Sequence, residues 1–300
     1  MKIDWIKICT QSAVIFFCFL ILSCSENDKS ELVVMSLNVR YDNPADAPND
    51  WQSRLPLIIE TINRQSPNLI GFQEVLKNQL DDLETLMPSY DYIGVARDDG
   101  RITGEFSPVF YMENRLRLLE QGTFWLSEKP GDTGSVGWDA ALPRIVTWAR
   151  FKDLEEQKEG ELSEFYFLNT HFDHKGNKAR LESARLILEF IKNVVQESQV
   201  VLCGDFNFTP DQDPYELITR GSEDFPGLKD ACIGRKDEIC RAEPTYNGFG
   251  KSQKNTRIDY IFTSKDWNVE NYETLQIIEG GTFISDHYPV IAKIRPGEIH

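Results

Sequence analysis

The sequence predicts one domain of mixed α-helices and β-strands that spans residues 32–295. Short runs rich in β-branched and aromatic residues alternate with longer runs whose apolar residues recur at helical spacing. With 41% hydrophobic and 27% charged residues, the 300-residue chain has enough apolar material for a core. No segment rich in Gly, Ser or Pro divides it, and no internal repeat stands out. These observations favour a single α/β domain.

Amphipathic runs and proline positions define the expected elements. Leu55, Ile58 and Ile62 share one helical face, and Pro67 follows at the point where that helix must end. The same reasoning predicts helices over 54–65, 78–87 and 178–195. Extended runs predict strands over 32–39, 68–73, 90–95, 107–111, 144–151, 165–170, 200–202, 257–263 and 290–294.

The first 23 residues predict an export signal that is not part of the fold. Lys2 and Lys7 precede an uninterrupted apolar run over 13–22. Ten residues form about 15 Å of helix, which is too short for the roughly 30 Å hydrocarbon core of a membrane. A stable membrane span is therefore the less favoured interpretation.

Cys24 lies where the apolar run stops, and 21–24 resembles a bacterial lipobox, in which the signal is cut before a lipid-bearing cysteine. Residues 24–31 form a polar, acidic tether similar to the surface-export signals of Bacteroidota lipoproteins. We therefore expect an exported protein held in the outer or cell membrane by a lipid on Cys24 alone. The alternatives are ordinary cleavage with a free Cys24, or a retained N-terminal anchor.

The chain is strongly acidic, with 48 acidic and 32 basic residues and a net charge of −16. Such a field repels long nucleic acids and argues against tight duplex binding. Phosphate chemistry stays open, because bound divalent cations would reverse the potential inside one cleft. Cys232 and Cys240 could form a disulfide in an exported protein, and two free thiols are the alternative.

Polar residues that could bind a metal or a phosphate gather at the ends of the predicted strands. Each alone is a weak signal, because a carboxylate after a strand is more often a turn former than a ligand. Rigid strand ends are nevertheless where a precise site can be built. In chain order the candidates form six motifs, which are Asn38, Gln73-Glu74, Asn169-Thr170-His171-Phe172-Asp173, Gly204-Asp205-Phe206-Asn207, Arg257-Ile258-Asp259-Tyr260 and Ser285-Asp286-His287.

These motifs resemble, in the same order, those of the endonuclease/exonuclease/phosphatase superfamily. That superfamily contains deoxyribonuclease I, neutral sphingomyelinases, inositol polyphosphate 5-phosphatases and the carbon-catabolite-repressor deadenylases. The resemblance covers essentially the whole chain after the signal. It implies a four-layered α/β sandwich, in which two mostly antiparallel sheets pack face to face between outer helices.

Hydrolysis of a phosphoester needs an in-line water, a base, and positive charge beside the phosphoryl oxygens and the leaving group. The resemblance makes Asn38, Glu74 and Asp286 the candidate ligands of Mg²⁺ or Mn²⁺, which prefer hard oxygen donors. Asp205 is the candidate for orienting or deprotonating the water. Asn207 is the candidate for hydrogen-bonding the pentacoordinate phosphorane.

Two histidines complete the expected catalytic set. His171 and His287 would donate hydrogen bonds to phosphate oxygens, and Asp259 would hold His287 through its other ring nitrogen. Whether His287 or Asp205 is the base stays open. The alternative for Asp259 is an ion pair with Arg257 at the end of its strand.

Arg144, Asp173 and Trp138 are the candidate substrate contacts. Arg144 and Trp138 lie in segments that resemble an uncharacterised bacterial lipoprotein branch of the superfamily. Arg144 could reach a phosphate, while Trp138 could line the pocket or simply pack. The remaining histidines, His174 and His300, are expected to have no role in the site.

The sequence thus predicts a metal-dependent phosphoesterase that acts on a small phosphoester or a short oligonucleotide, with no protein partner inferred. One alternative is a 3′ exoribonuclease like the deadenylase branch, which the net charge and export disfavour. The alternative from another class is a non-catalytic surface-binding lipoprotein, which the full set of expected catalytic residues disfavours. Neutral sphingomyelinase activity is a narrower option.

Overall fold

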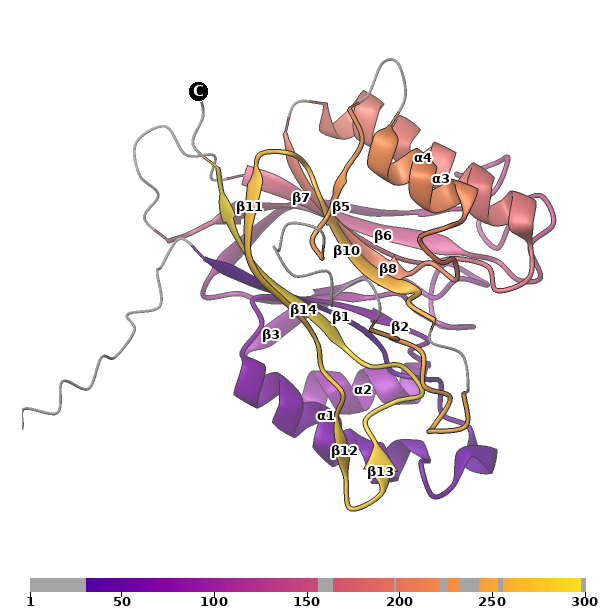
Figure 1. Cartoon of the computed structure of the whole chain (residues 1–300), viewed down its shortest axis with the longest axis vertical. Helices are drawn as coiled ribbons and strands as arrows, with labels where there is room; N and C mark the ends of the chain where they lie inside the picture. Colours follow the sequence, from indigo (N-terminus) through magenta and orange to yellow (C-terminus); the bar gives the residue numbers. More distant parts are fainter. Residues whose placement is uncertain are drawn as a thin grey trace, which may run out of the picture.

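Two six-stranded sheets pack face to face in a computed structural model that describes residues 31–155, 164–196, 198–221, 226–232, 243–252 and 256–297 (Figure 1). The first sheet has the order β11-β14-β1-β2-β4-β3, and the second has the order β5-β6-β7-β8-β10-β9. The strands of the first are β1 (Leu32–Asn38), β2 (Leu69–Gln73), β3 (Tyr90–Ile93), β4 (Val109–Met112), β11 (Trp267–Thr274) and β14 (Val290–Pro296). Those of the second are β5 (Leu116–Trp125), β6 (Ile145–Asp153), β7 (Glu164–His171), β8 (Gln199–Asp205), β9 (Lys229–Asp230) and β10 (Asp259–Thr263).

Helices cover the outer face of each sheet. Figure 1 shows α1 (Trp51–Gln65) and α2 (Lys77–Leu86) over the first sheet, and α3 (Asn177–Phe190) and α4 (Asp213–Arg220) over the second. One apolar cluster lies between the sheets, a second lies under α1 and α2, and a third lies under α3 and α4. The expected four-layered α/β sandwich is confirmed. β12 (Ile278–Glu279) and β13 (Thr282–Phe283) form a separate two-stranded hairpin beside α1.

Each sheet is antiparallel except for one central parallel pair. β1 and β2 are parallel neighbours joined by α1, and β7 and β8 are parallel neighbours joined by α3. A helix can make these connections because parallel neighbours must be joined by a long crossover. The register sets Asn38 opposite Gln73 in one sheet and His171 opposite Asp205 in the other. The two crossovers therefore deliver four of the six motifs to strand ends.

Local sequence explains where the helices begin and end. The α1 helix begins three residues before the expected position because the Asp50 carboxylate accepts a hydrogen bond from the Ser53 amide as an N-cap. It ends at Ser66, whose left-handed backbone closes the helix just before Pro67. The predicted helix 178–195 is α3 followed by a π-helical turn over Ile191–Val195.

The strands β5, β9 and β11, the β12–β13 hairpin and the α4 helix were not predicted. The β5 and β11 strands carry charged residues between their apolar ones, as exposed edge-side strands do, so their pattern is weak. The α4 helix is only eight residues long. The β8 strand also extends past the predicted 200–202 to Asp205. Gly204 and Asp205, which begin a motif expected to follow the strand, therefore lie within it.

A buried polar contact joins the two sheets beside the site. The Asn169 side chain on β7 donates hydrogen bonds to the carbonyls of Phe72 and Pro108, at 2.7 and 2.9 Å, and accepts one from Gln73 Nε2 at 2.8 Å. Nearby the sheets approach so closely that a Cβ on Gly71 would lie 2.4 Å from Cys203 Sγ. The relative position of the sheets is thus fixed at this end.

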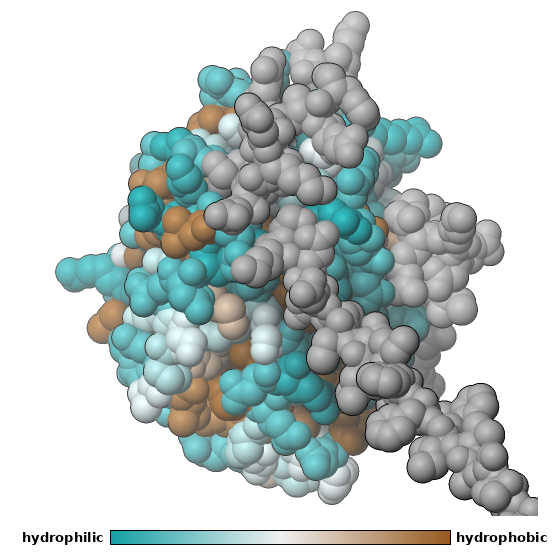
Figure 2. Space-filling view, turned by 90° about the vertical axis from the view of Figure 1, so that its left-hand side faces the viewer, coloured by the Kyte–Doolittle hydropathy of each residue, from teal (hydrophilic) through white to brown (hydrophobic). Residues whose placement is uncertain are grey.

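The N-terminal predictions fall on residues that the structure does not describe. Cys24 and the rest of 1–30 lie outside the described residues, as do Cys240 and His300. Cys232 takes part in a disulfide, so its pairing with Cys240 stays a prediction. None of the described residues forms a helix with the length and hydropathy that crossing a membrane requires. Hydrophilic residues dominate the described part of the face in Figure 2, where apolar groups are small and separate.

Replacing Asn169 by alanine should destabilise the fold, because it removes three buried hydrogen bonds that join the two sheets. We expect the free energy of unfolding in urea to fall by about 2–4 kcal/mol. Asn268→Ala is the matched control, because Asn268 is exposed on β11 and should change that free energy by less than about 0.5 kcal/mol. Equal stability of the two variants would contradict this role of Asn169.

Candidate active site

A cavity of about 640 Å³ opens where the central strands of both sheets end. Its volume lies in the usual range of small-molecule sites. Seven of the predicted residues line it, which are Glu74, Arg144, His171, Asp205, Asn207, Asp286 and His287. The other lining residues are Arg40, Tyr41, Glu105, Leu142, His174, Tyr246, Thr256 and Ile258.

The floor of the cavity is built around two carboxylates, one from each sheet. Glu74 follows β2 and Asp205 ends β8, and the buried amide of Asn38 donates to both. Its Nδ2 lies 3.1 Å from Glu74 Oε1 and 3.0 Å from Asp205 Oδ2, while its Oδ1 accepts from the Arg40 amide at 2.9 Å. Asn38 was expected to be a metal ligand. Both ends of its amide are engaged and it does not line the cavity, so in this structure it holds the two carboxylates in place, and its role as a metal ligand stays a prediction.

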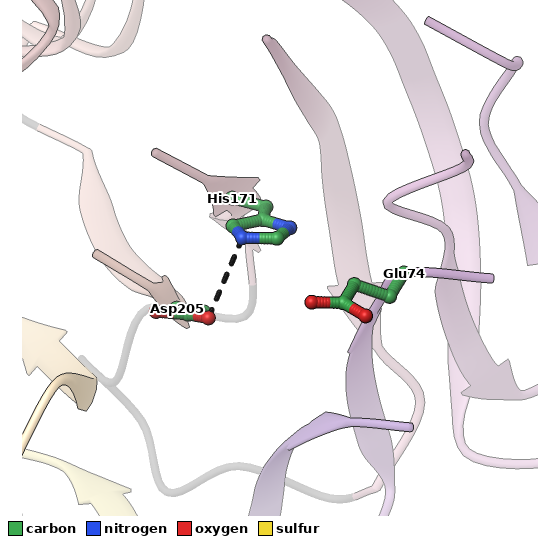
Figure 3. Close-up of side chains that lie close together, drawn as sticks. All are labelled: Glu74, His171 and Asp205. Carbon is green, nitrogen blue, oxygen red and sulfur yellow. Dashed lines mark ion pairs between the residues drawn. The ribbon is translucent and has the colours of Figure 1, made fainter. Parts of the chain in front are cut away.

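His171 completes a cluster of possible metal ligands with these carboxylates. Its Nε2 lies 3.4 Å from Asp205 Oδ2, and Glu74 faces the pair across the cavity (Figure 3). One ligand atom from each of Glu74, His171 and Asp205 lies within 4.8 Å of the others. Burial and the charge of Arg144 lower the pKa of His171 well below its ordinary value, so the ring is neutral. A neutral imidazole is the form that can bind a metal.

His287 has the opposite electrostatic environment. Its Nδ1 lies 2.9 Å from Asp259 Oδ2, which confirms in geometry the expected contact, and its Nε2 lies 3.7 Å from Asp205 Oδ2. Burial alone would lower the pKa of His287, but the charges of Asp259 and Asp205 raise it well above the ordinary value. The alternative for Asp259 is not found, because Arg257 forms a bidentate ion pair with Asp230 instead.

Asp205 is the most constrained acid in the site. Burial, helped by the charge of Asp259, raises the pKa of Asp205 to about 7. Its Oδ1 accepts the backbone amide of Asn207 at 3.0 Å, and the Asn207 side chain donates to the Phe172 carbonyl. Glu74 and Asn207 adopt positive φ angles of 61° and 51°, which cost a non-glycine residue about 1 kcal/mol or more. Such strain at strand ends is typical of functional residues.

Asp286 lies apart from the Glu74 cluster, with an arginine between them. The guanidinium of Arg40 approaches Glu74 Oε2 at 4.0 Å and Asp286 Oδ2 at 3.9 Å, and it binds Asp46 Oδ2 at 2.8 Å. Burial raises the pKa of Asp286, and the charge of Glu74 adds to the effect. Asp286 therefore lines the cavity as expected, but the guanidinium of Arg40 lies between it and Glu74.

Arg144 enters the cavity together with a residue that sequence reasoning had dismissed. Its Nη2 lies 3.0 Å from Nδ1 of His174, and both residues line the cavity. Asp173, a predicted substrate contact, lies behind Arg144 and is 1% exposed. It accepts hydrogen bonds from the amides of Ala141, Lys175 and Gly176 instead. Asp173, which belongs to the same motif as His171, thus lies behind the wall of the cavity and does not line it.

Other functional candidates were missed or misplaced. Trp138 does not line the cavity; it is half-buried, and its backbone amide is bound by Glu128. Glu105 does line it, lies 3.8 Å from His171 Nδ1, and is held by both terminal nitrogens of Arg97. No sequence signal marks Glu105, because it lies in a loop and acquires its place only through tertiary contacts.

The donor set fits a hard divalent cation. Glu74 and Asp205 offer carboxylate oxygens and His171 offers a neutral nitrogen, and a half-buried and a buried carboxylate this close need compensating positive charge. The position of Asp205 in this cluster differs from the expected assignment, in which Asn38 and Asp286 accompanied Glu74. The arrangement can hold a metal beside an acid of raised pKa and a protonated histidine.

Comparison with known proteins places the chain among phosphoester-cleaving proteins. The model of the endonuclease/exonuclease/phosphatase family matches residues 35–287. A solved endonuclease/exonuclease/phosphatase from Bacteroides vulgatus is 38% identical, with a TM-score of 0.81 over 89% of this chain and 99% of its own. A mannosyl-6-phosphatase from Bacteroides thetaiotaomicron is 36% identical, with a TM-score of 0.75 over 88% and 99%.

A more distant likeness extends to the carbon catabolite repressor group. Carbon catabolite repressor protein 4 homolog 5 of Arabidopsis thaliana is 24% identical over 220 residues, which are 66% of this chain. The match spans only 46% of that protein. The similarity expected from the motifs is therefore confirmed for the superfamily and for this group.

Glu74→Gln should weaken binding of Mn²⁺ to the metal-free protein, because it removes a carboxylate charge from the cluster. We expect the dissociation constant from isothermal titration calorimetry to rise by at least about tenfold. Glu189→Gln removes an equal charge from the exposed face of α3 and should leave binding unchanged. Unaltered affinity in Glu74→Gln would exclude Glu74 as a ligand.

Proposed function

The chain belongs to the endonuclease/exonuclease/phosphatase family, and from this premise we propose that it is an exported, lipid-anchored hydrolase that uses Mg²⁺ or Mn²⁺ to cleave a small phosphoester. The observation that carries the proposal is the convergence of Glu74, His171, Asp205 and His287 on one cavity. When bound, the metal would supply Lewis-acid stabilisation of the phosphoryl group. Glu74, with His171 beside it, would hold the ion, and Asp205 would lie next to it.

The raised pKa values of Asp205 and His287 divide the proton chemistry. Asp205, with a pKa of about 7, is poised to accept a proton from the attacking water near neutral pH. His287 is kept protonated by Asp259, so its Nε2–H can donate to a phosphoryl oxygen as negative charge develops there. This assignment favours Asp205 over His287 as the base. Asn207, fixed beside Asp205, would contribute a further polar contact to the phosphorane.

The substrate is expected to be a small phosphorylated molecule. A cavity of about 640 Å³ can enclose a sugar phosphate or a nucleotide, while the net charge of −16 disfavours long nucleic acids. The relative at 36% identity that is named a mannosyl-6-phosphatase favours a phosphorylated sugar. A 3′ exoribonuclease is the second candidate, and the likeness to the carbon catabolite repressor relative supports it.

The proposed site of action is outside the cytoplasm. The apolar run over 13–22 and Cys24 at its end support export and lipid attachment, and the acidic tether would separate the domain from the membrane. A lipid-held phosphoesterase of this kind would release phosphate or an alcohol from small esters that reach the cell envelope. No protein partner is needed for this activity.

The purified protein should hydrolyse p-nitrophenyl phosphate, or its bis ester, only with Mg²⁺ or Mn²⁺ present. Asp205→Asn and His287→Gln keep the shape of each side chain, and we expect each to lower kcat/KM at least about a hundredfold. Asp266→Asn, at an exposed position before β11, is the control and should retain full activity. Undiminished turnover in excess chelator would contradict the metal requirement.

Cys24→Ser should move the protein from the membrane fraction to the soluble fraction of cells that express the full chain, because the thiol that carries the lipid is lost. Immunoblotting of the separated fractions measures the shift. Cys203→Ser is the control, because Cys203 is buried in the core and cannot carry a lipid. Unchanged partitioning of Cys24→Ser would remove the lipid anchor from the proposal.

A further inference from the structure

One wall of the cavity holds unsatisfied hydrogen-bond donors. Arg144 is 4% exposed, and among the described residues neither its Nε nor its Nη1 has a hydrogen-bond partner. A buried guanidinium with free N–H groups is costly unless a ligand supplies acceptors. Because Arg144 lines the cavity, those acceptors are expected to come from a bound anion.

The neighbouring carboxylate cannot take this place. Asp173 Oδ2 lies 3.6 Å from Arg144 Nε, and both Asp173 oxygens already accept backbone amides, from Ala141 on one oxygen and from Lys175 and Gly176 on the other. Asp173 therefore balances the charge of Arg144 without occupying its donors. The guanidinium is held in place and remains available.

His174 completes the arrangement. Burial and the charge of Arg144 lower the pKa of His174, so the ring is neutral and its Nδ1 can accept from Arg144 Nη2 at 3.0 Å. In that tautomer the Nε2 carries the hydrogen and is a further donor. Arg144 and His174 thus present a guanidinium and an imidazole N–H to the cavity that both residues line.

We propose that Arg144 and His174 form a subsite for the terminal oxygens of a phosphomonoester and make the site selective for monoesters over diesters. A monoester has three unsubstituted oxygens and a second negative charge, so it can meet the acidic cluster's metal and the guanidinium together. In a diester one of these oxygens carries an organic group. Arg144 is only 4% exposed and Asp173 behind it is 1% exposed, so an organic group on the oxygen that meets the guanidinium would have to displace buried side chains.

This inference rests on the proposed hydrolase function and refines its substrate class. Water forms the new P–O bond, the ester P–O bond breaks, and the alcohol leaves the cavity with a proton. Inorganic phosphate then remains against Arg144 and His174. The same subsite should therefore bind inorganic phosphate as a product.

The test compares p-nitrophenyl phosphate and mannose 6-phosphate with bis-p-nitrophenyl phosphate. We expect wild-type kcat/KM to favour p-nitrophenyl phosphate over its bis ester by at least about tenfold. Arg144→Gln should lower monoester kcat/KM by about tenfold to a hundredfold and diester kcat/KM by less than about threefold. Arg144→Lys, which keeps the charge, should recover part of the loss. Arg117→Gln, exposed on β5, should change neither value.

His174 provides a variant that does not threaten the fold, because its ring is exposed. His174→Phe removes the acceptor for Arg144 and should raise KM for the monoester more than it lowers kcat. His174→Asn restores an acceptor and should recover part of the affinity. Isothermal titration of inorganic phosphate should show the same order of affinities, with wild type above His174→Asn and His174→Phe weakest.

The outcomes separate the two proposals. A wild-type enzyme that cleaves both esters equally well, or an Arg144→Gln variant that loses both activities in the same proportion, would overturn the subsite while the hydrolase function stands. If no ester is cleaved but inorganic phosphate binds in a manner that depends on Arg144, the hydrolase function fails and the anion subsite is supported. Phosphate binding that ignores both Arg144 and His174 would overturn the subsite in either case.

Discussion

The site depends on one buried amide that joins the two sheets. Asn38 donates to Glu74, which follows a strand of the first sheet, and to Asp205, which ends a strand of the second. Two carboxylates held this close repel each other, so their separation must be fixed by donors between them. The contact between Gln73 and Asn169 and the close approach at Gly71 keep the sheets in register at the same end. A sliding of one sheet would therefore dismantle the site before it unfolded the domain.

The same side-chain type acquires two chemistries from its surroundings. His171 is buried beside Arg144 and Arg97, and burial and these charges hold its pKa low, so its ring is neutral and can bind a metal. His287 faces Asp259 and Asp205, which hold its pKa high, so it is a donor to negative charge. Neither assignment could be made from the motifs, because a histidine after a strand gives no information on which charges will surround it. The charges around each histidine, more than the residue type, define its role in the site.

Sequence reasoning was accurate where strand ends carry the chemistry and failed where loops do. The motifs around Glu74 and Asp205 follow apolar strands, and the motif around His287 precedes one, so their convergence could be expected. His174 and Glu105 gain their roles from contacts between loops distant in sequence, and Trp138 loses its expected one for the same reason. The edge-side strand β5 was missed because charged residues interrupt its alternation.

This division has a consequence for how substrates are chosen. The reacting groups stand on strands whose geometry tolerates little change: a Cβ on Gly204, next to Asp205, would lie 2.1 Å from the Thr170 carbonyl oxygen. Arg144 and His174, by contrast, stand on connecting segments that can vary without disturbing the sheets. Relatives that share the fold can therefore keep one hydrolytic centre and differ in what they cleave. In this chain the loops bring a buried arginine with free donors to the centre, and that feature is what favours a terminal phosphate.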